Sequence, residues 1–305
     1  MPKKMAILVD EEVLKMSGKM EASKPGDQLF ENLFVNRDRE QTLETISEGL
    51  IAFMDNARRL LEDAEILLKA ERSASTQFLI TTANEEMAKS YILLDACRLD
   101  LSRHKSELKR LCLAFYDHVT KYAYNRVIRW SPLHDMADVK EKWDIETKKW
   151  WPSGEESGEP DMPHATYFMR EMPLYVDFID YDQDWSKPEQ IAAGYNALRI
   201  SNHSQSLSEA QQALKRLERT HEAGLYSPQS LAIFNDNFRR SYITEKTPSE
   251  SIDRLYEKAA QQIENDLGIS REEFLDSALH EWPLYAFTKK RERRPKQNCG
   301  WADLS

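Results

Sequence analysis

The sequence predicts an all-α protein, with a helical bundle followed by a loop-rich connector and a second, small helical region. The first observation is composition: only 9 of the 305 residues are glycine, whereas sheets joined by tight hairpins need many glycine-containing turns. The second is periodicity, because apolar residues recur every three to four positions over long stretches. The third is a set of explicit helix start and stop signals in the last third of the chain.

The first helix of the expected bundle begins at Thr45, where Thr45-Ile-Ser-Glu48 has the spacing of a capping box. The apolar residues that follow at helical spacing are Ile46, Leu50, Phe53, Ala57, Leu60, Leu61, Ala64, Leu67 and Leu68. The segment 1–40 mixes charge, glycine and proline without such periodicity. It is therefore expected to be an N-terminal arm.

Two more helices are expected, over about 75–99 and about 106–130, and Ser131-Pro132 ends the second of them. Three long helices with short links favour an antiparallel bundle over residues 41–132. The connector, 133–187, is rich in tryptophan and contains a Gly/Glu/Pro stretch, with one short strand expected at 173–178.

The helical region 188–290 is predicted from local punctuation, and a basic tail, 291–305, follows it. Ser227-Pro228 is expected to begin a helix, and Gly224 and Gly268 are expected to end helices. Three further capping boxes begin at Ser206, Thr247 and Ser270.

Composition narrows the class of protein. The three cysteines are odd in number and lack CxxC spacing, which argues against a disulfide framework or a zinc site. The apolar run 7–9 is too short for a signal peptide, and no stretch has the ~18 apolar residues that span a bilayer. We therefore expect a cytoplasmic protein without a membrane partner.

Charge is distributed unevenly along the chain. The formal net charge of -10 opposes loose binding to nucleic acid, but residues 98–129 carry eight basic and three acidic side chains, a local charge of +5. This segment is either a solvated helix face or a surface that faces phosphate.

Polar groups interrupt the apolar pattern of the second and third helices. Glu85, Glu86 and Lys89 form an island among large apolar residues on the second helix, and Lys89 is spaced to pair with either acid. On the third helix, the margin of the apolar face carries Ala114, His118, Lys121 and Asn125. His118 is expected to pair with the spare carboxylate if the two helices are neighbours. The cluster is then either a structural network of ion pairs or a site for general acid-base chemistry near a phosphate.

At these residues the sequence resembles the AbiV family of abortive-infection proteins, within the HEPN class of helical domains. Three stretches carry the resemblance: 84–89 (Asn-Glu-Glu-Met-Ala-Lys), 115–121 (Phe-Tyr-Asp-His-Val-Thr-Lys), and 174–177 (Leu-Tyr-Val-Asp) with Trp185. Ala88 stands where the family often has glycine, a mild departure because alanine also permits close helix approach. The resemblance implies anti-phage defence, and it covers about residues 44–190 but not the last third.

Many HEPN relatives resemble metal-independent ribonucleases with an Arg-x(4–6)-His motif, and they often act as dimers with the site between protomers. The resemblance therefore implies a homodimer. Arg98–His104, Arg129–His134 and Arg216–His221 all satisfy the motif, whereas Arg110–His118 does not. Three matches among seven histidines cannot select a catalytic one.

Two functions remain open. In the first, the protein is an RNA-cleaving toxin that shuts down translation, with His118 as general acid or base and Glu86 or Glu85 orienting it. Lys121, with Lys89 and Arg110, would stabilise the transition state, and Asn125 and Arg126 would contact RNA; no metal or other cofactor is expected. In the second, the protein is a non-enzymatic effector that binds a phage or host protein and blocks translation, with the connector aromatics, such as Trp143 and Trp185, as interface anchors. The alternative for these tryptophans is that they cover the bundle. A metal site is disfavoured, since bundle metal proteins carry Glu-x-x-His on two helices, and Glu218–His221 is the one such spacing here.

Overall fold

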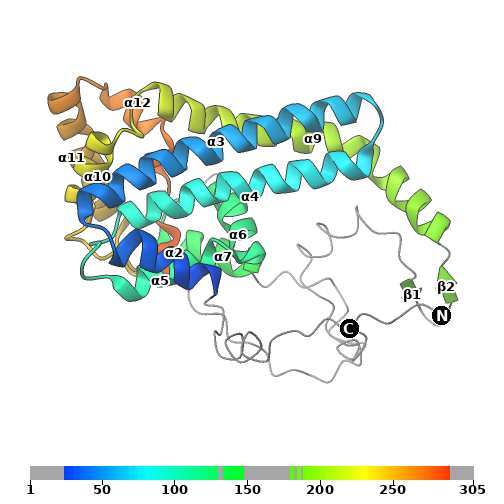
Figure 1. The fold of residues 1–305 in the computed structure, drawn as a ribbon, viewed down its shortest axis with the longest axis horizontal. Helices are drawn as coiled ribbons and strands as arrows, with labels where there is room; N and C mark the ends of the chain where they lie inside the picture. Colours follow the sequence, from blue (N-terminus) through cyan, green and yellow to red (C-terminus); the bar gives the residue numbers. More distant parts are fainter. Residues whose placement is uncertain (1–23, 130–132, 148–178, 182–183, 187, 289–305) are drawn as a thin grey trace, which may run out of the picture.

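The structure is a computed structural model that describes residues 24–129, 133–147, 179–181, 184–186 and 188–288, with backbone alone for 179–202. Figure 1 shows an assembly of helices in which the long α3 and α4 lie side by side. The elements, in chain order, are α2 (Pro25–Phe30), the π-helix η1 (Glu31–Val35), α3 (Arg39–Lys69), α4 (Ser73–Cys97), α5 (Lys105–Ala114), α6 (His118–Ile128), α7 (Met136–Thr147), β1 (Ile179–Tyr181), β2 (Asp184–Ser186), α9 (Pro188–Glu222), α10 (Pro228–Phe238), α11 (Ser249–Leu267), α12 (Arg271–Leu275) and the 3-10 helices η2 (Ala278–His280) and η3 (Leu284–Ala286).

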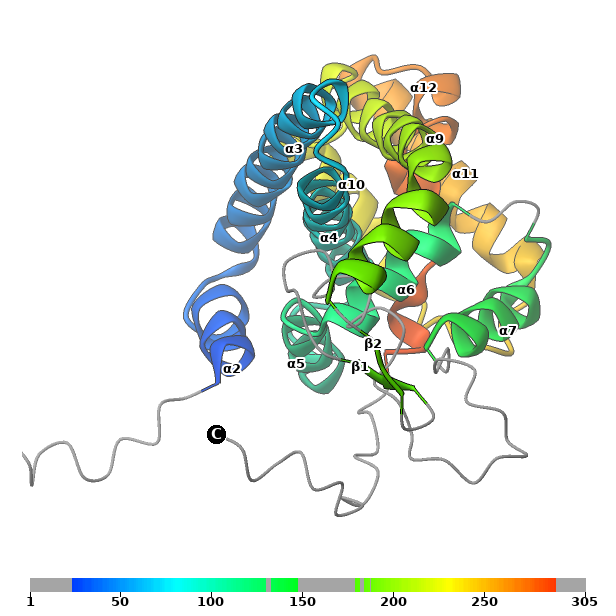
Figure 2. The same ribbon diagram turned by 90° about the vertical axis from the view of Figure 1, so that its right-hand side faces the viewer.

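The predicted all-α fold is confirmed. Helix α9 packs against both α3 and α4, and α6 lies against α4 on another side (Figure 2). The β-structure of the described residues is a short antiparallel pair, β1 and β2, in which Ile179 faces Ser186. The strand expected at 173–178 lies outside the described residues.

The first long helix begins earlier than its predicted start. Asp38 is the N-cap of α3: its side chain accepts a hydrogen bond from the Gln41 amide at 2.9 Å, and the Gln41 side chain accepts from the Asp38 amide at 3.3 Å. Thr45, the predicted cap, lies inside the helix and donates its hydroxyl to the Gln41 carbonyl. The prediction was wrong because two capping boxes lie close together, and the earlier one forms.

The expected N-terminal arm is also wrong from residue 25 onward. Phe30, Leu33 and Phe34 are buried in the core. Helix α2 approaches α5 so closely that a Cβ on Gly26 would lie 2.9 Å from the Leu113 side chain. An element of this length is too short for periodicity to reveal, so it is formed by packing rather than by a local signal. Residues 1–23 lie outside the described residues.

The predicted third helix is two helices, α5 and α6, separated at Phe115–Asp117. The Asp117 side chain accepts a hydrogen bond from the Thr120 amide at 3.0 Å and thereby caps a new helix. His118 is consequently the first residue of α6 rather than the middle of a longer helix.

The helix signals of the last third have mixed outcomes. Ser227 and Ser270 cap α10 and α12 as predicted, and Gly224 and Gly268 adopt positive φ values of 77° and 72° at helix ends. Ser206, by contrast, lies inside α9, a helix of 35 residues. Helix α11 begins without a side-chain cap, because the Thr247 hydroxyl accepts from the Thr244 amide instead.

One hydrophobic core joins the predicted bundle to the last third of the chain. Ile46, Leu50 and Ile80 belong to the same buried cluster as Leu217 and Phe234. Trp143, for which the sequence left open an interface anchor or a cover for the bundle, is buried with its ring 5.4 Å from that of Tyr124. The domain boundaries remain a prediction, but the last third packs directly on the helices that carry the candidate site. None of the described helices is both long and apolar enough to cross a membrane.

Candidate active site

A carboxylate on α4 gathers two basic side chains from α6. The Nδ1 atom of His118 lies 2.8 and 2.9 Å from the two carboxylate oxygens of Glu85, and Lys121 Nζ lies 2.6 Å from Glu85 Oε2. The expected contact between His118 and the preceding long helix is therefore present, and Glu85 makes it.

The local sequence explains this convergence. The Asp117 cap places His118 in the first turn of α6, and Lys121 follows three residues later, so both side chains lie on one face of the helix. Glu85 is buried in α4, a helix with apolar residues on several sides. A carboxylate there needs partners, and α6 supplies two.

The electrostatics of the cluster keep Glu85 ionised. Burial opposes the ionisation of Glu85, but hydrogen bonds from His118 and Lys121 outweigh it and hold the pKa of this carboxyl below its ordinary value. An ionised carboxylate can only accept, so the facing Nδ1 of His118 carries a proton. This contact fixes the tautomer and leaves Nε2 as the basic nitrogen of the neutral ring.

The polar margin of α6 continues beyond these residues. Asn125 donates through Nδ2 to the backbone carbonyl of Asn84 at 2.8 Å, and Arg129 donates to the Asn84 side-chain oxygen at 2.7 Å. Burial lowers the pKa of Arg129 to about 10, which leaves the guanidinium charged at neutral pH. Sequence reasoning missed Arg129 as a member of this strip, although its position four residues after Asn125 is the signal that finds it.

Glu86 and Lys89 form a separate pair. Lys89 Nζ lies 2.6 Å from Glu86 Oε1, 5.2 Å from the centre of the Phe53 ring and 5.8 Å from that of Phe115. Glu86 is thus engaged within its own helix. Of the two carboxylates predicted to orient His118, it is Glu85 that touches the ring.

Two other predicted RNA contacts pair with different acids. Arg110 on α5 approaches Glu107 at 3.4 Å, and Arg126 faces Glu146 of α7 at 3.8 Å. Arg126 keeps 42% of its side chain exposed. Their roles toward RNA remain predictions.

The three Arg-x(4–6)-His pairs have other contacts. Arg98 is buried against Asp95, and the Nδ1 atom of His104 accepts a hydrogen bond from the Asp100 amide at 3.0 Å. Arg216 pairs with Glu281, while the His221 ring stacks on Tyr226. His134 is exposed.

Metal and thiol chemistry have no evident location in the part of the chain that is described. Those residues contain no group of three or more His, Cys, Asp or Glu side chains placed to hold a metal ion. Cys97 and Cys112 are buried, and burial raises the pKa of each thiol to about 12.

A family model described as AbiV, in the HEPN class, matches residues 45–209, which is more than half of the chain. The chain belongs to the AbiV family. This membership assigns it to abortive infection, a form of phage defence. The matched segment includes Glu85, His118 and Lys121, so the family region and the polar cluster coincide. Neither a curated protein nor a solved structure matches the chain.

Proposed function

We propose that this AbiV-family protein is an abortive-infection effector that cleaves RNA without a metal ion, through His118 and Glu85. The observation that carries the proposal is the geometry of His118. Its Nδ1 is held by an ionised, buried carboxylate, while 26% of its side chain is exposed. An oriented imidazole that solvent reaches suits general acid-base chemistry.

The chemistry follows from this arrangement. His118 Nε2 takes the proton of an RNA 2′-hydroxyl, whose oxygen attacks the adjacent phosphorus. The bond from phosphorus to the 5′-oxygen breaks, and the imidazolium returns its proton to that leaving oxygen. The products are a 2′,3′-cyclic phosphate and a 5′-hydroxyl. Glu85 stabilises the transient imidazolium through Nδ1.

Lys121 has a different role from the one expected from sequence. It is buried and lies 2.6 Å from Glu85, so it holds the carboxylate ionised and in place. Contact with phosphate falls to more exposed cations, for which Lys89, Arg110 and Arg126 are the candidates. Cleavage of host or phage RNA in the cytoplasm would stop translation. By family resemblance the active species is a homodimer, which light scattering at micromolar concentration tests.

The second candidate is an effector that blocks translation by binding a phage or host protein. Exposed apolar side chains favour it: Leu113, in the last turn of α5, and Tyr116, between α5 and α6, are 37% and 49% exposed. Such side chains are natural anchors for a protein partner.

The deciding experiment incubates purified protein with total RNA and tRNA in EDTA and compares wild type with His118→Ala, Glu85→Gln and His104→Ala. His104 is the matched control, since it is also half-buried and follows an arginine at motif spacing. We expect cleavage to be lost in His118→Ala, reduced about 100-fold in Glu85→Gln and kept in His104→Ala.

Cleavage that persists in His118→Ala overturns this assignment. If folded wild-type protein cleaves nothing, the partner-binding function gains weight. Loss of phage defence in Tyr116→Ala, with RNA intact in infected cells, would then support it.

A further inference from the structure

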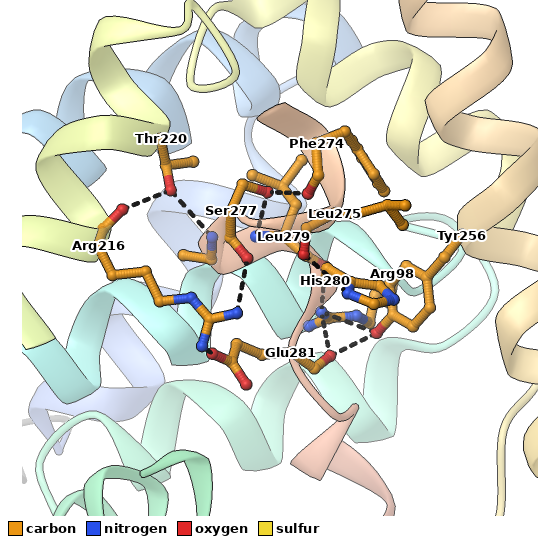
Figure 3. Close-up of polar contacts among 11 residues, drawn as sticks. Arg98, Arg216, Thr220, Tyr256, Phe274, Leu275, Ser277, Leu279, His280 and Glu281 are labelled. Carbon is orange, nitrogen blue, oxygen red and sulfur yellow. Dashed lines mark hydrogen bonds and ion pairs between the residues drawn. The ribbon is translucent and has the colours of Figure 1, made fainter. Parts of the chain in front are cut away.

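The last turn of α4 is connected to the C-terminal segment Ser277–Tyr285 by a buried arginine. Arg98 is 2% exposed and donates to the backbone carbonyls of Leu279 and Glu281, each at 2.8 Å (Figure 3). The same guanidinium lies 2.7 Å from an oxygen of Asp95. A side chain from the family region thus holds a segment more than 180 residues later in the sequence.

Other helices hold the same segment from other sides. Arg216 of α9 donates to the Ser277 carbonyl at 3.3 Å and forms an ion pair with Glu281. The Thr220 hydroxyl accepts a hydrogen bond from the Ala278 amide at 2.9 Å, and the Tyr256 hydroxyl of α11 donates to the Glu281 carbonyl. Figure 3 shows the segment between these helices. Its backbone is therefore fixed relative to α4.

Asp95 links this segment to the helix that carries His118. Its Oδ1 atom pairs with Arg98, and its Oδ2 atom accepts from the Leu284 amide at 3.0 Å and from the Tyr124 hydroxyl at 2.8 Å. Tyr124 is fully buried in α6, directly before Asn125. One carboxylate thus joins α4, α6 and the C-terminal segment.

The cost of burying this network indicates that it does more than stabilise the fold. A buried ion pair is often no more stabilising than apolar residues of the same volume, and its best-attested use is to specify one arrangement. Three donors fix the orientation of the Asp95 carboxylate. The hydroxyl of Tyr124 therefore meets an acceptor at one place, which sets the position of α6 along α4.

We propose that Asp95 and Tyr124, held by the C-terminal segment Ser277–Tyr285, are positioning residues that place His118 against Glu85. This inference rests on the proposed function for its catalytic consequence, but the placement of the ring is a separate, measurable property. It also gives the last third of the chain a role: it supplies the backbone that orients the anchor of α6.

The test compares Tyr124→Phe with Tyr256→Phe in the full chain. Each variant removes one buried hydroxyl from the same network. The Tyr124 hydroxyl joins α6 to Asp95, whereas the Tyr256 hydroxyl joins α11 to Arg98 and Glu281. Two readouts are taken: the nitrogen chemical shifts of the His118 ring, assigned with His118→Ala, and the steady-state kinetics of RNA cleavage. A urea melt confirms that both variants fold.

We expect Tyr124→Phe to shift the His118 ring signals and to lower kcat about tenfold with KM unchanged, because misplacement of a catalytic group acts on the chemical step. Tyr256→Phe should leave both readouts at wild-type values, because Arg98 and the Leu284 amide still hold Asp95. Unchanged His118 signals in Tyr124→Phe, or equal changes in both variants, overturn the positioning role. If the wild-type protein cleaves no RNA but Tyr124→Phe still shifts the His118 ring signals, the positioning role stands and the proposed function is rejected.

Discussion

Two ionic clusters lie on α4 about three turns apart, and they differ in how much of their side-chain surface is exposed to solvent. In the Asp95–Arg98 cluster the side chains are 1% and 2% exposed, whereas in the Glu85 cluster His118 is 26% exposed. The carboxyl groups respond in opposite directions. Burial raises the pKa of Asp95 to about 6 despite Arg98 and Tyr124, while the donors around Glu85 hold its pKa below the ordinary value.

This contrast distinguishes a structural ion pair from a candidate active site. Where desolvation dominates, the network specifies an arrangement and is closed to substrate. Where donors dominate and one partner reaches solvent, the charges are available for chemistry. Three predictions test the distinction and a fourth tests the helix caps, taken from the largest expected effect to the smallest.

Arg98→Ala should be the most damaging change. It leaves Asp95 as a buried carboxylate without its counter-charge and removes the donors to Leu279 and Glu281. We expect a loss of about 3–5 kcal/mol in the free energy of unfolding, measured by urea denaturation. A loss below about 1 kcal/mol would mean that this cluster does not hold the C-terminal segment.

The pH dependence of the free energy of unfolding should reflect Glu281, a buried carboxyl next to the Asp95–Arg98 cluster. Burial raises the pKa of Glu281 to about 7, although Arg216 and Arg98 oppose this shift. A carboxyl whose folded pKa is raised stabilises the protein below its unfolded pKa, and that contribution is lost as pH rises through the folded value.

Wild type should therefore lose stability between pH 4.5 and 7.5, with about 3 kcal/mol of the fall coming from Glu281. Glu281→Gln should flatten this dependence in urea melts at the two pH values. An equal fall in both proteins would contradict the assignment. Glu85 acts in the opposite direction, and its contribution is lost as pH drops below its lowered pKa.

Lys121→Met removes a positive charge from the Glu85 cluster, as Arg98→Ala does from the Asp95 cluster, and its effect should be milder. Glu85 keeps its contacts to His118, and solvent reaches part of the site. We expect a loss of about 2 kcal/mol in unfolding free energy, because one charged hydrogen bond is removed from a largely buried acid. A loss as large as that of Arg98→Ala would erase the distinction between the clusters.

The smallest effect concerns helix caps far from either cluster. Ser270→Ala removes a formed capping box and should cost about 1 kcal/mol. Ser206→Ala is the matched control: the same sequence pattern lies inside α9, where alanine is the better helix former, so stability should stay level or rise slightly. Equal losses by thermal melting would show that the Ser206 pattern acts as a cap after all.

The sequence determined what depends on neighbours within a turn or two. Helical periodicity predicted the fold class, Ser227 and Ser270 predicted their caps, and Gly268 predicted a helix end. The spacing of His118, Lys121 and Asn125 predicted one polar margin, and the charge island predicted a carboxylate facing it. These signals are local because hydrogen bonds within a helix join residues three or four apart.

Only the tertiary structure decided which groups meet across the chain. It placed Glu85 rather than Glu86 against His118, because the two neighbouring side chains point in different directions around α4. It ended α5 before His118, extended α9 through a false capping box, and buried Phe30, Leu33 and Phe34 by packing. Above all, it brought Leu279, Glu281 and Leu284 to Arg98 and Asp95. Contacts over such separations depend on how helices pack, which no periodicity within one helix encodes.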